Sequence, residues 1–382
     1  MNQVMIVAAE ASSVTYAQRL LEYWQSENKK IKAFGVGSKD MEKLGFERIG
    51  KAEEMAVVGA AEIISAYSRL KKVFDDLVAA AAERRPNVVI VMDYPEFNLM
   101  LSKKLHALGI PVVYYISPQV WAWRKGRVKT IQKYCQKVFV LFPFEVAFYK
   151  EHDVPCQFVG HPILDELDEK LFDPVYRKNH RNQCGIRDDE IVVGLMPGSR
   201  NLELKQHFAI QLEVAKKLAL KHQNVKVLIM VAPTFEKEKL EPYLEDFRLE
   251  YIVMKDDPAR MVHLADFVLV ASGTATLMVG LLQKPMVIMY RMKFMTGLFA
   301  KIMIRGVKYF GLVNLILGRE VCPERWQSGA NTETLFTLMD RYFTDPAYTA
   351  KVREDLAGLR QHLGDKGATK RVAESLEEYF KS

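Results

Sequence analysis

Val88-Val-Ile-Val-Met-Asp-Tyr-Pro-Glu-Phe-Asn98 is the stretch that decides the fold. Its apolar residues run without interruption into Asp93, and Pro95 follows shortly after. Such a run is typical of a strand that is buried on both faces, as the central strands of a parallel sheet are. Parallel sheets bind ligands at the carboxyl ends of their strands, where Asp93 lies. Asp93 is therefore a candidate general base, and the alternative is that it caps the following helix.

Strand-like apolar runs alternate with helical segments along the chain. We predict strands at residues 4–9, 32–36, 88–92, 112–116, 138–142 and 157–159, and again at 191–196, 225–231, 251–254, 267–270 and 286–289. The first helix follows a turn at Glu10, with Ser12 or Ser13 as its N-cap. This alternation predicts an α/β protein with two doubly wound, parallel-sheet domains that face a central cleft.

A charged segment between the two sets of strands marks the domain boundary. Residues 165–189 follow Gly160-His-Pro162 and carry little apolar pattern, as an interdomain connection does. The predicted domains are residues 1–164 and 165–345. Residues 346–382 are compatible with helices, which we expect to pack back across the domain junction.

Composition and charge exclude several classes of protein. The chain has 382 residues, 49% of them hydrophobic and 26% charged, which fits a globular protein with two full-sized cores. A net charge of +7 is too small for a dedicated nucleic-acid binder, but it suits an anionic surface or phosphorylated substrates. Four cysteines without metal or redox spacing predict reduced thiols in a cytoplasmic protein. The N-terminus predicts a strand rather than a signal peptide, and no apolar run reaches the roughly 18 residues that span a bilayer.

Two glycine-containing loops follow strands in the second domain. In Met196-Pro-Gly-Ser-Arg200, Gly198 lets a ligand approach the backbone and Arg200 offers a planar fork to phosphate oxygens; an ordinary turn is the alternative. In Val270-Ala-Ser-Gly-Thr-Ala-Thr276 a helix begins near Thr274 and directs free N–H groups at a ligand, unless the loop is a plain Ser/Thr N-cap. Two such loops in one domain predict a nucleotide-diphosphate donor.

No Asp-x-Asp pair occurs in the chain. A glycosyl donor would therefore need Arg200 and helix dipoles, rather than a divalent cation, to stabilise its leaving diphosphate. We predict neither a metal nor a cofactor. No Gly-x-Gly-x-x-Gly opens the first helix, which argues against an NAD-dependent enzyme.

Ser117-Pro-Gln-Val-Trp-Ala-Trp-Arg124 follows a strand end on the same side of the sheet as Asp93. Its two tryptophans and its arginine suit a sugar platform or a phosphate clamp. The alternative is a loop that is anchored by buried tryptophans.

Two apolar stretches have the composition of membrane contacts. Residues 55–64 are apolar near an expected helix start, and residues 291–305 interleave basic with bulky apolar side chains, as interfacial helices do. The alternative for the second stretch is a core-facing helix with a solvated basic side. The side chains expected to contact the membrane are Val57, Val58, Ile63, Ile64, Phe294, Leu298 and Ile302.

Six motifs together resemble those of the lipid-A-disaccharide synthase family, in the family's order and over nearly the whole chain. They are Ser117-Pro-Gln-Val-Trp-Ala-Trp-Arg124, Leu141-Phe-Pro-Phe-Glu145 with Phe148-Tyr149, Phe158-Val-Gly-His-Pro162, Pro197-Gly-Ser-Arg200 with Glu203, Ser272-Gly-Thr-Ala275, and Tyr290-Arg291. The first of these strings is highly specific.

The resemblance implies an inverting, metal-independent glycosyltransferase of the GT-B type, with two Rossmann-like domains. Such enzymes join UDP-2,3-diacylglucosamine to 2,3-diacylglucosamine 1-phosphate, giving a β-1,6-linked disaccharide 1-phosphate and UDP. The family also implies peripheral association with the cytoplasmic face of the inner membrane of Gram-negative bacteria. A homodimer is a further expectation, and no nucleic-acid partner is expected.

The resemblance also assigns site residues. Asp93 matches the family's proposed base, which would deprotonate the acceptor 6-hydroxyl as that oxygen attacks the anomeric carbon of the donor. The first domain would bind the acceptor and the second the UDP-sugar. The positions assigned to the donor are Gly198, Ser199, Arg200, Glu203, Ser272, Gly273, Thr274, Ala275, Tyr290, Arg291, Asn314, Glu324 and Gln327. Those assigned to the acceptor side of the cleft are Glu10, Ser12, Asn98, Gln119, Trp121, Arg124 and His161.

Several positions depart from the family pattern. The family's first turn, Gly-Glu-x-Ser-Gly-Asp, is here Ala9-Glu-Ala-Ser-Ser-Val14, so both glycines and the aspartate are replaced. Met278 stands where the family has a glutamate that is expected to bind the donor ribose, Glu96 replaces an aspartate, and Leu312-Val-Asn314 replaces Leu-Pro-Asn. A divergent paralogue that binds lipid or nucleotide-sugar, or a transferase for another sugar nucleotide, is therefore the alternative to an active synthase.

Overall fold

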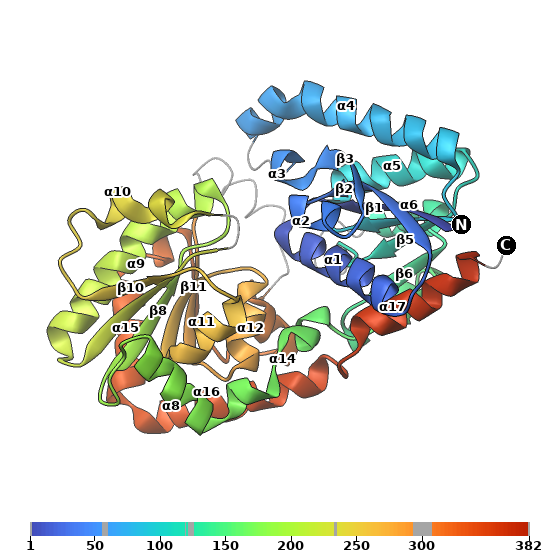
Figure 1. The fold of residues 1–382 in the computed structure, drawn as a ribbon. Helices are drawn as coiled ribbons and strands as arrows, with labels where there is room; N and C mark the ends of the chain where they lie inside the picture. The colour runs from blue at the N-terminus through green and yellow to red at the C-terminus, as the bar shows by residue number, and fades with distance from the viewer. Residues whose placement is uncertain are drawn as a thin grey trace. The chain divides into compact units, whose positions relative to one another are not determined.

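The computed structural model describes residues 2–55, 60–118, 120, 126–232, 235–292 and 308–380; for Ala11 and residues 60–66 it describes the backbone alone. The chain forms two compact units, residues 1–165 with 363–382 and residues 166–362 (Figure 1). The predicted C-terminal segment, 346–382, is divided between them. Helix α16 (Pro346–Ala357) belongs to the second unit and helix α17 (Ala368–Leu376) to the first.

The first unit is a seven-stranded parallel sheet with strand order β3-β2-β1-β4-β5-β6-β7. Its strands are β1 (Asn2–Ala8), β2 (Ile31–Gly37), β3 (Glu47–Lys51), β4 (Val88–Met92), β5 (Val112–Tyr115), β6 (Lys137–Val140) and β7 (Cys156–Phe158). Its helices are α1 (Ala11–Ser26), α2 (Lys39–Glu42), α3 (Ala52–Met55), α4 (Ala60–Arg84), α5 (Pro95–Ala107), α6 (Arg127–Tyr134), α7 (Pro143–Lys150) and α17. Helix α1 packs beside α17, and α5 contacts both α4 and α6 (Figure 1).

The second unit is a six-stranded parallel sheet with strand order β10-β9-β8-β11-β12-β13. Its strands are β8 (Ile191–Met196), β9 (Val225–Met230), β10 (Tyr251–Met254), β11 (Phe267–Ala271), β12 (Met286–Tyr290) and β13 (Glu324–Trp326). Its helices are α8 (Pro174–Gln183), α9 (Asn201–Lys221), α10 (Glu241–Leu244), α11 (Pro258–Leu264), α12 (Ala275–Leu281), α14 (Leu312–Leu317), α15 (Thr332–Thr344) and α16.

The predicted central strand is confirmed as β4. Every residue of Val88–Met92 is fully buried, and β4 lies between β1 and β5. Strands β3 and β13 have no counterpart among the predicted strands. Both lie at a sheet edge and carry charged residues, such as Glu47 and Glu324, because an edge strand is not buried on all sides.

Both sheets reverse their strand order at an inner pair of strands. The reversal lies between β1 and β4 in the first unit and between β8 and β11 in the second. Open parallel sheets bind ligands outside the carboxyl ends of such strands, because the loops there diverge to opposite faces. Ligand-binding residues are therefore expected directly after these four strands.

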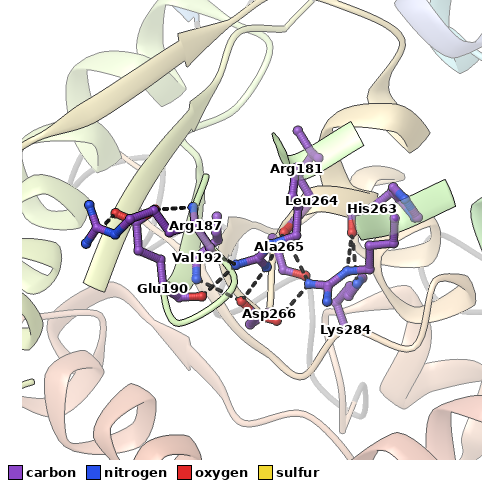
Figure 2. A network of polar contacts seen from close by, with 10 residues as sticks. Arg181, Arg187, Glu190, Val192, His263, Leu264, Ala265, Asp266 and Lys284 are labelled. Carbon is purple, nitrogen blue, oxygen red and sulfur yellow. Dashed lines mark hydrogen bonds and ion pairs between the residues drawn. The ribbon is translucent and has the colours of Figure 1, made fainter. Parts of the chain in front are cut away.

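The charged segment predicted as a connection folds onto the amino end of β11 in the second unit (Figure 2). The Asp266 carboxylate accepts hydrogen bonds from Arg177 at 2.7 Å and from Arg181 at 2.9 Å, both on α8. Arg177 also donates to the backbone carbonyl of His263 at the end of α11. Burial opposes ionisation of Asp266, but Arg177, the Val192 amide and Arg181 together lower its pKa. The polar network lies at the amino ends of the inner strands β8 and β11, whereas the candidate site lies at their carboxyl ends, and it fixes α8 to this unit.

Candidate active site

Asp93 follows β4 and lies in an unusual backbone conformation. Asp93 and Tyr94 have φ angles of +47° and +45°, in the left-handed region that side chains other than glycine rarely adopt. Each such residue costs about 1–3 kcal/mol and persists where surrounding structure enforces it, often at functional sites. The Asp93 N–H donates to the Ile116 carbonyl at 3.2 Å. The Asp93 carbonyl accepts from the Tyr114 hydroxyl at 2.6 Å and from the Asn98 amide at 2.7 Å.

The N-cap of helix α5 is Tyr94, and Pro95 is its first residue. Asp93 therefore lies one residue before the N-cap position of this helix. Asn98 is fully buried, and its amide donates to the carbonyls of both Met92 and Asp93. These two hydrogen bonds from the buried Asn98 hold the backbone at Asp93 in place.

Helix α1 begins differently from the prediction. Glu10 is its N-cap, so the prediction of Ser12 or Ser13 was wrong. The Ser13 hydroxyl accepts from the Glu10 N–H at 3.1 Å and donates to the Glu10 carbonyl at 2.8 Å. Ser13 is fully buried, and both of these hydrogen bonds join its hydroxyl to the backbone of Glu10 at the start of the same helix. The first turn therefore accommodates a serine where the family has a glycine.

His161 is buried in the first unit between aromatic rings. Its ring centroid lies 6.3 Å from that of Tyr16 and 5.4 Å from that of Phe142. The Ile163 N–H donates to Nδ1 of His161 at 3.2 Å. Burial lowers the pKa of His161 to about 3, so the ring is neutral near pH 7.

Several predicted residues lie outside the described part of the chain. Among the predicted acceptor residues, these are Gln119, Trp121 and Arg124 of the tryptophan loop, residues 117–124. Among the predicted membrane contacts, they are Val57, Val58, Phe294, Leu298 and Ile302. Ile63 and Ile64 lie in α4, and their side chains are likewise outside the description.

The loop after β8 is built around Gly198. This residue has φ +120°, and a Cβ added to it would lie 2.5 Å from Oε2 and 2.6 Å from Cβ of Glu203. Only glycine fits both demands. Oε2 of Glu203 accepts from the Ser199 N–H at 2.9 Å, and its Oε1 pairs with Nη1 of Arg200 at 3.2 Å. Glu203, on the first turn of α9, thus holds the loop and orients Arg200, whose side chain is 36% exposed and remains accessible to an anion.

The loop after β12 meets the loop after β8 through a residue that was not predicted. Arg291 donates its backbone N–H to Nε2 of His207 at 2.9 Å, and Nδ1 of His207 lies 2.9 Å from the Pro197 carbonyl. The ring centroids of His207 and Tyr290 are 5.4 Å apart. Burial raises the pKa of Tyr290, and so does Glu203, while Arg200 lowers it. The predicted residues at 198–203 and 290–291 therefore form one cluster.

The loop after β11 leaves room for a ligand. Gly273 and Thr274 are exposed, and a Cβ at Gly273 would meet no described residue other than its chain neighbours within 4 Å. Thr274 is the N-cap of α12, which has 7 residues and includes the buried Met278. The Ser272 hydroxyl donates to the Phe310 carbonyl at 3.2 Å.

Three predicted donor residues bond mainly to nearby backbone. The Glu324 carboxylate accepts from the N–H groups of Phe310 at 2.8 Å and Gly311 at 2.7 Å. Asn314 donates to the Cys322 carbonyl at 2.6 Å. The Gln327 side-chain oxygen accepts from the Met292 N–H at 3.2 Å. These side chains shape the β12–β13 side of the site rather than presenting free polar groups.

Neither a metal cluster nor a membrane span is present in the part of the chain that the structure describes. No group of three or more His, Cys, Asp or Glu side chains there is arranged to hold a metal ion. No helix within the same residues is long and apolar enough to cross a bilayer.

Solved structures with similar folds define the class of protein. The chain is similar to UDP-GlcNAc 2-epimerase from Neisseria meningitidis bound to UDP-GlcNAc, with a TM-score of 0.63, 13% identity and coverage of 98% of this chain and 100% of that one. It is also similar to a glycosyltransferase from Rickettsia africae ESF-5, with a TM-score of 0.58, 11% identity and coverage of 100% and 99%. At such low identity the likeness shows the fold alone. The two doubly wound units have the GT-B fold, which confirms the predicted fold class.

Sequence relatives then define the family. The family model described as Lipid-A-disaccharide synthetase matches residues 4–371. The lipid-A-disaccharide synthase of Myxococcus xanthus is 34% identical over 376 residues, covering 98% of this chain and 97% of that protein. That of Anaeromyxobacter dehalogenans strain 2CP-C is 36% identical with the same coverage, and that of Geobacter metallireducens is 36% identical over 97% of this chain and 96% of its own length. The chain belongs to the lipid-A-disaccharide synthetase family.

Proposed function

We propose that this chain is a hexosyltransferase that joins UDP-2,3-diacylglucosamine to 2,3-diacylglucosamine 1-phosphate. The products are the β-1,6-linked disaccharide 1-phosphate and UDP. The observation that carries this proposal is the family match over residues 4–371, which includes both sets of strand-end loops.

Asp93 acts as the general base in this proposal. Its carboxylate takes the proton of the acceptor 6-hydroxyl as that oxygen forms a bond to the anomeric carbon of the donor. The bond from the anomeric carbon to the diphosphate oxygen breaks on the opposite face, and UDP leaves with the electron pair. A single displacement of this kind inverts the anomeric configuration. The transition state has oxocarbenium character, which a nearby carboxylate also stabilises.

The second unit binds the donor. Arg200 and the backbone at Gly198 and in Ser272–Ala275 hold the diphosphate, and positive charge there stabilises the leaving group without a divalent cation. Tyr290 and Arg291 border the same site. The acceptor meets the first unit at Glu10, Ser12 and the tryptophan loop, while Asn98 and His161 support that side from the interior.

A non-catalytic paralogue is the competing function. Met278 is 4% exposed and Val14 is apolar, so neither residue supplies the anionic group of the family pattern. Retention of Asp93, Arg200 and the Trp121-Ala-Trp-Arg124 string favours the enzyme.

A UDP-release assay tests the proposed reaction. Purified chain in detergent is expected to release UDP only when both acylated substrates are present. Addition of EDTA is expected to leave the rate unchanged, because protein cations rather than a metal stabilise the diphosphate. The absence of acceptor-dependent UDP release would favour the paralogue.

We further propose that this chain binds peripherally to the cytoplasmic face of an anionic membrane and assembles as a homodimer. The net charge of +7 and the mixed basic and apolar composition of residues 291–305 support the membrane contact. Changing Phe294, Leu298 and Ile302 to serine is expected to reduce sedimentation with anionic liposomes, each side chain contributing about 1–2 kcal/mol of apolar burial. Leu220→Ser is the matched control, since Leu220 is 78% exposed on α9 of the second unit. Unchanged liposome binding of the triple variant would place the contact elsewhere.

A further inference from the structure

His207 occupies a buried polar row on helix α9. Glu203, His207 and Gln211 are spaced by four residues, so they lie on one face of this 21-residue helix. The side chains beside them, such as Leu204 and Phe208, are buried and apolar. A fully buried imidazole in such a setting needs partners for both nitrogens.

The hydrogen bonds of His207 fix its tautomer. The Arg291 N–H donates to Nε2 at 2.9 Å, so Nε2 carries a lone pair. Nδ1 therefore carries the proton and donates it to the Pro197 carbonyl at 2.9 Å. Nε2 also lies 3.2 Å from the Arg291 carbonyl. Burial lowers the pKa of His207, which keeps this neutral form.

The two backbone partners of His207 belong to loops that are not neighbours in the sheet. Pro197 follows β8 and Arg291 follows β12, and β11 lies between these strands. The loop of β11, with the exposed Gly273, therefore leaves the sheet between them. Gln211 strengthens the same arrangement, because its side-chain amide donates to the Met196 carbonyl at 3.2 Å.

We propose that His207 is a positioning residue of the donor site, which ties the Pro197–Arg200 loop to Tyr290–Arg291 and so sets the opening that receives the nucleotide diphosphate. This inference rests on the proposed function. His207 contacts backbone on both sides and does not itself touch the substrate. Its removal leaves each loop attached to its own strand but removes the hydrogen bonds through which His207 joins them.

UDP affinity of single-residue variants tests this proposal. His207→Leu removes both hydrogen bonds. His207→Asn places an amide near the position of Nδ1 and keeps the bond to Pro197, while His207→Gln reaches the position of Nε2 and keeps the bond to Arg291. We expect the dissociation constant for UDP to rise about tenfold or more in the Leu variant, with smaller rises in the Asn and Gln variants. The KM for the UDP-sugar should rise similarly, while the KM for the acceptor is unchanged.

His263→Leu is the matched control, since His263 is also a buried histidine of the second unit. Its ring lies 5.5 Å from that of Tyr176, at the amino end of β11. This variant should lower the melting temperature but leave UDP affinity unchanged. Wild-type UDP affinity in folded His207 variants would overturn the positioning role; if the Leu variant does not fold, the Asn and Gln variants decide. A wild-type chain that binds no UDP would instead overturn the proposed function, and the positioning role with it.

Discussion

Asp93→Asn is expected to lower kcat by about 10²- to 10⁴-fold, the range that a general base contributes. The amide has nearly the same shape as the carboxylate but cannot accept the proton of the acceptor hydroxyl. Asparagine also tolerates the left-handed conformation, here φ +47°, better than most residues. The hydrogen bonds from Tyr114 and Asn98 reach the backbone carbonyl of residue 93, so they survive the substitution. The initial rate of UDP release with saturating substrates measures the effect.

Glu96→Gln is the matched control for that loss. Glu96 is an exposed carboxylate on the first turn of α5, where it pairs with Arg127. Its neutralisation is expected to leave kcat within about twofold, because surface ion pairs contribute little. If Asp93→Asn retained the wild-type kcat, Asp93 would not be the base, although the family membership of the chain would stand.

Arg200→Leu is expected to weaken donor binding by about 10- to 150-fold, which corresponds to the loss of about 1.5–3 kcal/mol for a charged hydrogen bond. The guanidinium is oriented by Glu203 at 3.2 Å and remains partly exposed. The dissociation constant for UDP, measured by calorimetric titration, should rise accordingly. Arg200→Lys should give a smaller rise, because an ammonium keeps the charge but loses the planar fork.

A distant arginine of the same unit provides the control. Arg187 has a side chain that is 65% exposed and pairs with Asp189 near the amino end of β8, whereas Arg200 follows the carboxyl end of this strand. Arg187→Leu should leave UDP affinity unchanged. Equal UDP affinity of the Arg200→Leu variant and the wild type would remove Arg200 from the diphosphate site.

The sequence predicts the interior of the fold better than its margins. The inner strands Val88–Met92 and Ile191–Met196 have the predicted bounds, because their apolar runs end where burial ends. The edge strand Tyr251–Met254 also has its predicted bounds, because its sequence is apolar although its residues are half-buried or exposed. The edge strands β3 and β13 escape this signal, since they are short and partly polar. The N-cap of α1 was also not predicted, because glutamate is not among the residue types that favour the N-cap position. Hydrogen bonds between the Ser13 hydroxyl and the Glu10 backbone support this helix start.

The candidate site shows the same limit. The two glycine loops after β8 and β11 could be predicted, because glycine and side chains of the types that suit phosphate directly follow apolar runs. His207 could not, since its partners Pro197 and Arg291 are 10 and 84 residues away and both contribute backbone atoms. The only available signal was the spacing of Glu203, His207 and Gln211 on an apolar helix face. Similarly, the backbone contacts of Asn314 and Glu324 depend on the path of the chain around β13.

We expect this chain to form a glycosidic bond between two acylated glucosamines. Mass spectrometry of the lipid product tests it most directly, with purified chain, UDP-2,3-diacylglucosamine and 2,3-diacylglucosamine 1-phosphate as the only reactants. We expect a tetra-acylated disaccharide that carries one phosphate, in an amount equal to the UDP formed, and at least about 100-fold less of it with the Asp93→Asn variant over the same time. Recovery of both monosaccharides unchanged from a folded chain that binds UDP would contradict it.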